Sequence, residues 1–249
     1  MKVLVSGSTG LIGTALIHQL AAAPHQIVRL VRSSPPLGEA EVDWDGMAAA
    51  EIEGLDWVVH LAGENIAARR WSAAQKARIR DSRVDRTRLL CETLARLARP
   101  PRVLVCASAI GYYGDRGDEV LREDSAAGEG FLPEVSRAWE AAAEPARGKG
   151  IRVVHLRFGV VLSRDGGALA KMLLPFKLGA GGKMGNGQQY MSWIALDDVV
   201  GAICHALETD TLQGPVNVVA PSPVKNADFI RLWNRAMPLF ERHSGIKSD

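Results

Sequence analysis

Three glycines near the amino terminus, Gly7, Gly10 and Gly13, constrain this chain more than any other feature. An apolar run at residues 3–5 predicts a buried strand before them, and apolar spacing predicts a helix over residues 11–20. A strand, a glycine turn and a helix in this order let the backbone approach a pyrophosphate at the helix N-terminus. The alternative is a glycine-rich turn without a ligand. The sequence thus predicts a dinucleotide contact formed by Gly7, Thr9, Gly10, Leu11, Ile12 and Gly13.

The second predicted strand, residues 26–31, indicates which dinucleotide is bound. Sites that select NAD place an acidic residue about 20 residues after the glycines, where it binds the adenosine ribose. Here no Asp or Glu occurs between Thr14 and Gly38, and the strand runs into Arg32 and Ser33. A guanidinium beside hydroxyls offers charge-assisted donors to a 2′-phosphate. We therefore expect NADP(H), bound by Val31, Arg32 and Ser33; the alternative is a solvated loop position for Arg32.

The composition is typical of a soluble globular enzyme. With 249 residues the chain can bury a large core, and its net charge of +2 gives no reason to expect nucleic acid as a partner. We see no signal peptide and no apolar run of about 20 residues, so we expect a cytoplasmic protein without membrane contact. The six histidines lack metal-ligand spacing, and no metal site is predicted. The scattered Cys91, Cys106 and Cys204 are typical of buried thiols in a reducing compartment.

Strand and helix patterns alternate along the rest of the chain. This alternation predicts an α/β fold, a doubly wound parallel sheet of the Rossmann type with ligands at the carboxyl ends of the strands. Glycine-rich loops are expected over most of residues 159–196. We divide the chain into a dinucleotide-binding core at 1–160 and a substrate lobe at 161–249. The predicted strands are 55–63, 102–107, 151–156 and 216–219, the last returning to the sheet; the predicted helices are 72–99 (broken or kinked), 134–146, 197–207 and 226–237.

Several longer motifs resemble those of one superfamily. Together with the glycine motif, Asp56-x-Val-Val-His-Leu-Ala-Gly63, Ser108 before Tyr113-Gly114, and Trp193-Ile-x-x-Asp197-Asp198-Val resemble the extended short-chain dehydrogenase/reductases. Gly63-Glu-Asn-Ile66, Arg70-Trp71, Ala109-Ile-Gly-Tyr-Tyr-Gly114 and Trp139-Glu140-Ala-Ala are similar to an atypical branch, the NAD-dependent epimerase/dehydratase-like proteins of unknown function. The resemblance covers roughly residues 1–230. We expect a small, shortened C-terminal substrate lobe and a poorly ordered tail at 241–249.

The resemblance implies further contacts to a nicotinamide cofactor. Leu61, Ala62 and Gly63 end a predicted strand beside the glycine turn, where small side chains let the backbone lie close to the cofactor. Arg83 matches a motif position on a basic helix and is expected to reach phosphate charge, whereas the other cations of that helix also fit a solvated face. Val161 follows the strand that passes the nicotinamide ring in the superfamily, which implies a backbone contact there.

The chain lacks the catalytic pair that the superfamily uses. Short-chain dehydrogenases use a Tyr as proton donor or acceptor, and a Lys four residues later lowers the pKa of that phenol and binds ribose. No Tyr-xxx-Lys occurs here, and no lysine lies between Lys76 and Lys149. The helix that should bear the pair aligns Leu132 and Ser136 with the expected Tyr and Lys. The predicted binding features are therefore present without the standard catalytic ones.

A replacement for that pair is predicted in the loop after the strand at 102–107. Ser108 stands where the superfamily places a hydroxyl that orients a carbonyl, and Tyr112 or Tyr113 would supply a phenol. Glu134 and Glu140 are expected to be surface carboxylates of a helix, and acid/base groups only if they are buried. Ser108, Tyr112 and Tyr113 are therefore the candidate catalytic residues.

Two functions remain open from the sequence. One is an NADP(H)-dependent oxidoreductase or epimerase acting on a small carbonyl or nucleotide-sugar-like substrate; the other is a non-catalytic NADP(H)-binding module that reports cofactor state. Glycine-rich segments at 164–167, 179–183 and 185–190 are expected to be mobile loops over a ligand or else ordinary turns. Asp197 and Asp198 are expected to cap a helix. The substrate is a small molecule of unknown identity, and a homodimer is left open.

Overall fold

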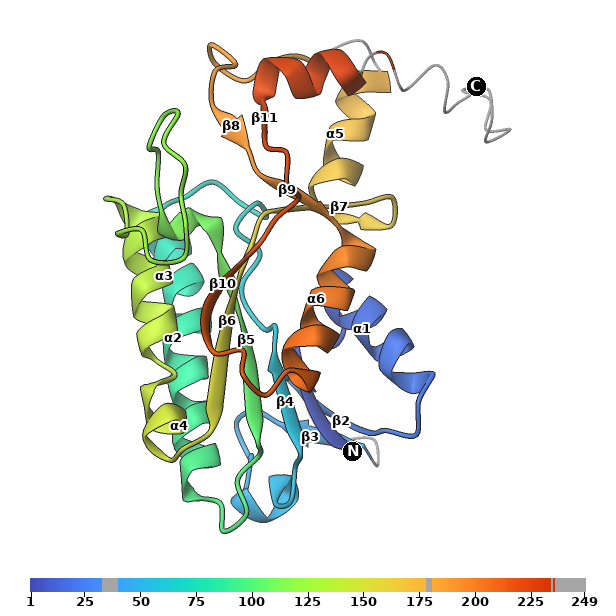
Figure 1. Ribbon diagram of the computed structural model, residues 1–249, viewed down its shortest axis with the longest axis vertical. Helices are drawn as coiled ribbons and strands as arrows, with labels where there is room; N and C mark the ends of the chain where they lie inside the picture. The colour runs from blue at the N-terminus through green and yellow to red at the C-terminus, as the bar shows by residue number, and fades with distance from the viewer. Residues whose placement is uncertain (33–39, 178–180, 234, 236–249) are drawn as a thin grey trace.

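A seven-stranded sheet forms the centre of the computed structural model, which describes residues 1–32, 40–177, 181–233 and 235. All neighbouring strands are parallel, in the order β10-β6-β5-β4-β1-β2-β3 (Figure 1). The predicted doubly wound Rossmann fold is confirmed, and the strand order reverses between β1 and β4. The strands are β1 (Lys2–Ser6), β2 (Gln26–Val31), β3 (Glu41–Asp43), β4 (Trp57–His60), β5 (Val103–Ala109), β6 (Arg152–Phe158) and β10 (Gly214–Val218).

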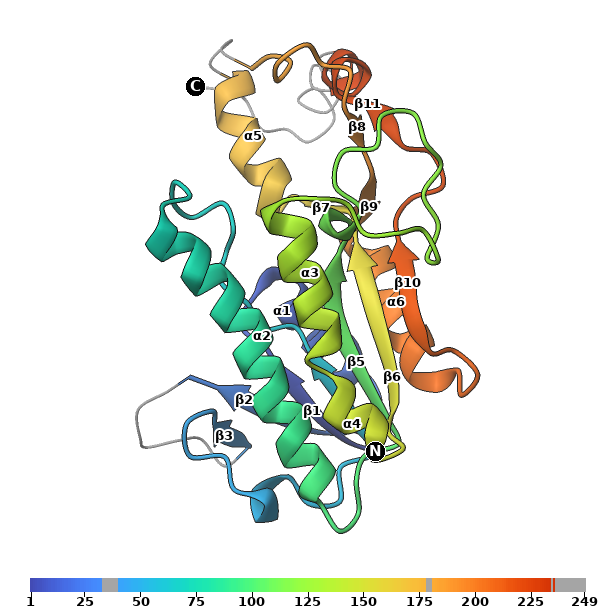
Figure 2. The same cartoon turned by 90° about the vertical axis from the view of Figure 1, so that its left-hand side faces the viewer.

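Helices cover both faces of this sheet. α1 (Leu11–Ala21) and α6 (Leu196–Glu208) pack together on one face, and α2 (Ala73–Arg96), α3 (Phe131–Ala141) and α4 (Glu144–Gly148) cover the other (Figures 1 and 2). Short 3-10 helices lie at Ala49–Ile52 and Ile110–Tyr112. These helices cover the two faces of the sheet and leave the carboxyl ends of its strands to other elements.

The helix expected to break or kink within 72–99 is one continuous helix, so that prediction is wrong. Val84, Leu90 and Leu94 keep one face of α2 buried along its length. The Ser82 hydroxyl donates to the Ile79 carbonyl oxygen one turn earlier, so this polar residue satisfies its donor within the helix.

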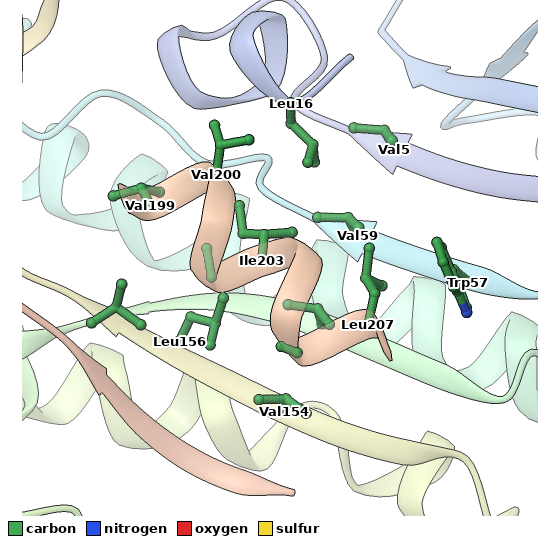
Figure 3. Packing of buried hydrophobic residues seen from close by; sticks show 14 of the residues in the cluster. Val5, Leu16, Trp57, Val59, Val154, Leu156, Val199, Val200, Ile203 and Leu207 are labelled. Atoms are coloured by element: carbon green, nitrogen blue, oxygen red, sulfur yellow. The ribbon is translucent and has the colours of Figure 1, made fainter. Parts of the chain in front are cut away.

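Alternating apolar side chains fill the two interfaces between sheet and helices. On β1, Val3 and Val5 belong to the core under α1 and α6, whereas Leu4 belongs to the core under α2. Full burial of one such side chain contributes about 1.5–3 kcal/mol. Figure 3 shows the α6 side chains that meet the sheet: Val199, Val200, Ile203 and Leu207. This packing fixes the strand ends that carry the candidate site.

A smaller group of elements lies beyond the carboxyl ends of the strands (Figure 1). Buried Met191, Phe229 and Ile230 give it an apolar cluster of its own. The prediction of glycine-rich loops over most of 159–196 is wrong, because this stretch contains paired strands and a helix. The elements are β7 (Val160–Ser163) paired with β9 (Trp193–Ala195), β8 (Tyr190–Met191) paired with β11 (Val224–Lys225), α5 (Gly167–Lys177), and a helical segment at 226–233.

Two local predictions can be compared with the structure. The segment at 164–167 is a tight turn, the second of the two alternatives, because Leu162 pairs with Gly167, Ser163 pairs with Gly166, and Gly167 has φ +72°. Asp197 and Asp198 lie in the first turn of α6 and do not cap it: the capping position is Ala195, without a side-chain hydrogen bond. Carboxylates in a first turn still favour the helix through its dipole.

Parts of other predictions lie outside the described residues. They concern Ser33, residues 179–180 and the tail at 241–249. Among the residues that are described, no helix has the length and apolar character needed to cross a membrane.

Candidate functional site

The glycine turn between β1 and α1 fits the close approach of a dinucleotide backbone. Gly7 has φ +69°, and a Cβ there would lie 2.7 Å from the carbonyl carbon of Leu61. A Cβ at Gly13 would lie 2.2 Å from the carbonyl oxygen of Gly7, so only glycine lets α1 begin this close to the turn. The first N–H groups of α1 have no intrahelical partners. An anion at this point would therefore meet free donors and no side chain.

The other residues predicted for this turn surround it. Thr9 and Gly10 are exposed, whereas Leu11 and Ile12 are half-buried at the start of α1. The Leu11 side chain also contacts the turn before α5, since a Cβ at Gly167 would lie 3.0 Å from its Cδ2. β7, which carries Val161, leads directly into that turn. The structure thus brings the Val161 segment next to the glycine turn.

The end of β4 lies beside the glycine turn, where the Ser6 hydroxyl adds to the backbone pairing of β1 with β4. The backbone N–H groups of Leu61 and Ala62 approach the Ser6 Oγ at 3.2 and 3.4 Å. The Ser6 Oγ also hydrogen-bonds the His60 Nδ1 at 2.6 Å. Burial lowers the pKa of His60 to about 4, so the imidazole is neutral at physiological pH. Leu61 and Ala62 therefore lie where the sequence predicts, beside Gly7.

Arg83 and Gly63 are in contact. A Cβ at Gly63 would lie 3.2 Å from the Arg83 Cζ, so the glycine leaves room for the guanidinium. The Arg83 Nη1 donates to the carbonyl oxygens of Glu64 and Ile79 at 3.0 and 3.1 Å. Burial lowers the pKa of Arg83, while the Glu64 carboxylate acts in the opposite direction. The predicted contact of Arg83 with phosphate remains a prediction.

A cavity of about 580 Å³, lined by three arginines and three carboxylates, opens between the end of β2 and α2. The exposed Arg32 lines it, while Val31 is half-buried at the end of β2. Arg29 was missed by sequence reasoning: its Nε donates to the Ser8 Oγ of the glycine turn at 3.2 Å. Its position two residues before Val31, on the same face of a strand, was the available signal. The other lining residues are Glu64, Arg78, Asp81, Ser82, Asp85, Arg86 and Leu89.

A second polar group, the Arg157 cluster, lies at the carboxyl ends of β5 and β6. Its members are Arg157, Glu140, Ser108, Tyr112, Tyr113, Asn217 and Glu123, and its centre is the Arg157 guanidinium, which is 2% exposed. Arg157 Nε and Nη2 donate to the two oxygens of Glu140, each at 2.9 Å. The Ser108 hydroxyl donates to the Glu140 Oε1 at 2.6 Å. This bidentate pair joins α3 to β6 and fixes the Ser108 hydroxyl.

Both tyrosines predicted for catalysis also belong to this cluster. The buried Tyr113 phenol donates to the Asn217 Oδ1 at 2.6 Å and accepts from Arg157 Nη1 at 2.8 Å. The Tyr112 ring centroid lies 3.5 Å from the Arg157 Cζ, a cation–π contact. The Asn217 N–H donates to the Glu123 carboxylate at 2.8 Å. The structure thus places Ser108, Tyr112 and Tyr113 around one guanidinium.

The Glu140 carboxylate and the Arg157 guanidinium of this cluster both stay ionised. Burial alone would raise the pKa of Glu140, but hydrogen bonds from Arg157 and Ser108 outweigh it and lower that pKa. Glu140 raises the pKa of Arg157 in turn. The prediction of a surface carboxylate is therefore wrong for Glu140, whereas Glu134 is exposed as expected. Arg157 was the signal that could have revealed this. It lies in the apolar strand β6, and a buried cation requires a partner of opposite charge.

Side chains that could ligate a metal, and the two most buried thiols, are characterised by their surroundings in the fold. Within residues 1–32, 40–177 and 181–233, no three His, Cys, Asp or Glu side chains gather as a metal site. Burial raises the pKa of Cys91 to about 12 and that of Cys106 well above its usual range, so both thiols stay protonated.

Comparisons with known proteins identify similar chains. The model of the NAD dependent epimerase/dehydratase family matches residues 3–219. An epimerase family protein of Mycobacterium tuberculosis is 44% identical over 239 residues, which cover 94% of this chain and 78% of that protein. Human epimerase family protein SDR39U1 is 40% identical over 240 residues, covering 95% of this chain and 80% of that protein.

Two solved structures at comparable identity share the fold. The crystal structure of human SDR39U1 with NADPH has a TM-score of 0.88 at 39% identity, covering 96% of this chain and 80% of that one. A structure from Corynebacterium glutamicum, described as a nucleoside-diphosphate sugar epimerase, has a TM-score of 0.85 at 40% identity. That match covers 96% of this chain and 51% of the other, so this chain spans about half of that protein.

Proposed function

The chain belongs to the NAD dependent epimerase/dehydratase family, and from this premise we propose that it binds NADP(H) and uses it in an oxidoreductase or epimerase reaction. The proposed substrate is a small carbonyl or nucleotide-sugar-like molecule. The observation that carries the proposal is the glycine turn, where Gly7 and Gly13 have no room for a Cβ at the N-terminus of α1. The human relative whose structure contains NADPH supports the choice of cofactor class.

The charge beside β2 supports NADP(H) over NAD(H). Arg32 is exposed at the end of β2 and shares a cavity with Arg78 and Arg86. Arg86 is already paired with Asp45, so Arg32 is the guanidinium that we propose for the charge-assisted contact with a 2′-phosphate. The acidic residue that would bind an unphosphorylated ribose is missing between Thr14 and Gly38.

The Arg157 cluster supports a defined role for Ser108. A bound nicotinamide cofactor supplies the hydride donor or acceptor. Glu140 is ionised and accepts a hydrogen bond from the Ser108 hydroxyl, so the Ser108 Oγ can act only as an acceptor toward a further partner. We propose that it receives a hydrogen bond from a substrate hydroxyl, and that Tyr113 or Tyr112 is the proton-transfer group.

The cofactor preference is tested by the substitution Arg32→Asp. We expect wild-type protein to bind NADPH much more tightly than NADH, and Arg32→Asp to lose at least about tenfold of NADPH affinity because a charge-assisted contact becomes a repulsion. Isothermal titration calorimetry with both cofactors measures the ratio. The matched control is Arg88→Asp, since Arg88 is an exposed cation of α2 outside the cavity. Equal affinities for NADPH and NADH in the wild type would contradict the proposal.

A second candidate function, a non-catalytic NADP(H)-binding module, is favoured by one observation. The Ser108 and Tyr113 hydroxyls both have internal partners, and α3 carries Leu132 and Ser136 where the superfamily has its Tyr and Lys. Incubation of the protein with stereospecifically deuterated NADPH and a metabolite pool separates the two functions. We expect the label to be lost, and Ser108→Ala to prevent that loss while NADPH still binds. Label retention with every pool, alongside tight NADPH binding, favours the module.

A further inference from the structure

A row of polar side chains crosses the sheet beneath α2 and α3 (Figure 2). In register, Ser6 on β1 pairs with His60 on β4, His60 with Cys106 on β5, and Cys106 with His155 on β6. All four are buried, and partners in register point to the same face of a sheet. Among the described residues the His155 Nε2 finds no hydrogen-bond partner, whereas both ring nitrogens of His60 have one. His60 is therefore the member of this row that is tied to its surroundings.

The hydrogen bonds of His60 continue to both sides. Its Nδ1 lies 2.6 Å from the Ser6 Oγ, and its Nε2 lies 2.9 Å from the Thr87 Oγ1 on α2. The Thr87 Oγ1 also accepts from the Trp139 Nε1 on α3 at 2.9 Å. The first two backbone N–H groups after β4 donate to the Ser6 Oγ at 3.2 and 3.4 Å. Trp139, Thr87, His60 and Ser6 thus form one continuous series of hydrogen bonds, here called the α3–β1 network.

The number of lone pairs fixes the direction of these bonds. A hydroxyl oxygen has two lone pairs and one proton. The two backbone N–H groups occupy both lone pairs of the Ser6 Oγ, so the Ser6 hydroxyl donates to the His60 Nδ1. Because burial lowers the pKa of His60 to about 4, the neutral ring carries its proton on Nε2 and donates it to the Thr87 Oγ1. Thr87 therefore accepts from two buried donors, His60 and Trp139.

The α3–β1 network ends at the tightest part of the cofactor site. A Cβ at Gly7 would lie 2.7 Å from the carbonyl carbon of Leu61 and 2.8 Å from the backbone nitrogen of Ala62. These are the residues whose N–H groups the network holds. A movement of this backbone would therefore change the shape of the glycine turn. At its other end the network reaches Trp139, which precedes Glu140 on α3.

We propose that Thr87 is a positioning residue of the cofactor site, which acts through His60 and Ser6 to set where the backbone after β4 lies against the glycine turn. Thr87 is 0% exposed, so it acts on a bound dinucleotide only through other residues. Without its hydroxyl, two buried N–H donors lose their acceptor, and the His60 ring must move to find another. The inference rests on the proposed function, since it requires an NADP(H) site.

Thr87→Val removes the hydroxyl and keeps the shape of the side chain. We expect calorimetry to show NADPH affinity reduced about fivefold or more, because two buried hydrogen bonds are lost. The matched control is Thr93→Val: Thr93 is also buried on α2, but its hydrogen bonds stay within that helix. This control should keep NADPH affinity within about twofold of the wild type. Thr87→Ser, which retains the hydroxyl, should restore the affinity.

A double-mutant cycle tests whether Thr87 acts through Ser6. Ser6→Ala removes the acceptor of the two backbone N–H groups and should itself weaken NADPH binding about fivefold or more. If both residues act through one network, the combined variant should bind NADPH about as tightly as Ser6→Ala alone. Long-range 1H–15N correlation spectra of the wild-type protein should show the Nε2–H tautomer of His60.

Four results would overturn the inference. NADPH binding by Thr87→Val as tight as by Thr93→Val would show that Thr87 only supports the fold. Additive losses in the combined variant would mean that Thr87 and Ser6 act separately. Unchanged affinity in Ser6→Ala, or an Nδ1–H tautomer of His60, would contradict the network even if Thr87→Val does not fold. Tight NADPH binding by the wild type in these cases leaves the proposed function intact, whereas absence of wild-type binding refutes both.

Discussion

The glycine turn and the Arg157 cluster lie at the same edge of the sheet but are built in opposite ways. The turn depends on backbone geometry within residues 7–13, where Gly7 and Gly13 have no room for a Cβ. The cluster depends on side chains, and its hydrogen bond from Tyr113 to Asn217 joins residues 104 positions apart. The turn therefore tolerates no additional atoms at its tightest glycines. The cluster, by contrast, requires that each buried charge keeps its partner.

The largest expected effect on cofactor affinity comes from breaking the turn without touching the cluster. In Gly13→Ala the new Cβ would lie 2.2 Å from the Gly7 carbonyl oxygen, and backbone atoms must shift to relieve the contact. We expect NADPH affinity to fall at least about hundredfold, which corresponds to about 2.7 kcal/mol. Calorimetric titration of the folded variant measures the loss.

Gly201→Ala is the matched control for that substitution. Gly201 lies within α6, and a Cβ there would meet nothing within 4 Å. This change should leave NADPH affinity unchanged and stabilise the protein by about 0.5–1 kcal/mol, because alanine favours a helix interior. If Gly13→Ala binds NADPH as tightly as Gly201→Ala does, the turn is not limited by space.

The largest expected effect on stability comes from breaking the cluster while the turn stays intact. Arg157→Met leaves the Glu140 carboxylate buried without its bidentate partner. Removing one member of a buried pair costs about 3–5 kcal/mol, and we expect a loss of this size in the free energy of unfolding from urea titration. NADPH affinity of the folded fraction should change little, because the Arg157 side chain is 2% exposed and its hydrogen bonds go to other residues of the cluster.

An exposed ion pair provides the control for this second prediction. Arg147 pairs with Glu144 on the surface of α4 at 2.5 Å. Arg147→Met should cost less than about 1 kcal/mol, as exposed pairs usually do. Similar losses in Arg157→Met and Arg147→Met would show that the buried pair contributes no more than a surface one.

The same contrast explains what the sequence could predict. The turn could be predicted because its signal is local: three closely spaced glycines, Gly7, Gly10 and Gly13. Apolar runs likewise predict where strands occur along the chain. The partners of Arg157 could not be predicted from the sequence, because the fold brings together residues of α3, β5, β6 and β10. Glu140 was expected on a surface since nothing in its helix reveals the buried cation opposite.

The errors outside the site have a similar cause. α5 was missed because glycines on both sides of it suggested loops, whereas the tight turn at Gly166–Gly167 allows the helix to begin. Arg29 was missed because its side chain, on β2, contacts Ser8 in the turn that follows the neighbouring strand β1. Local patterns thus predicted most strands of the central sheet and the helices that flank it, but missed α5, the short strands near it and the contacts between elements.

The smallest expected effect sharpens the comparison within the cluster, where two adjacent tyrosines differ in their partners. Tyr113→Phe removes a phenol that bonds both Asn217 and Arg157, and should cost about 1 kcal/mol in the free energy of unfolding. Tyr112→Phe keeps the ring beside Arg157 and should stay within about 0.5 kcal/mol of the wild type. Denaturant titration measures both, and equal costs would contradict the assigned partners. The deuterium assay then separates structure from chemistry, because the variant that stops label loss identifies the phenol that transfers the proton, whichever of the two is the more stable.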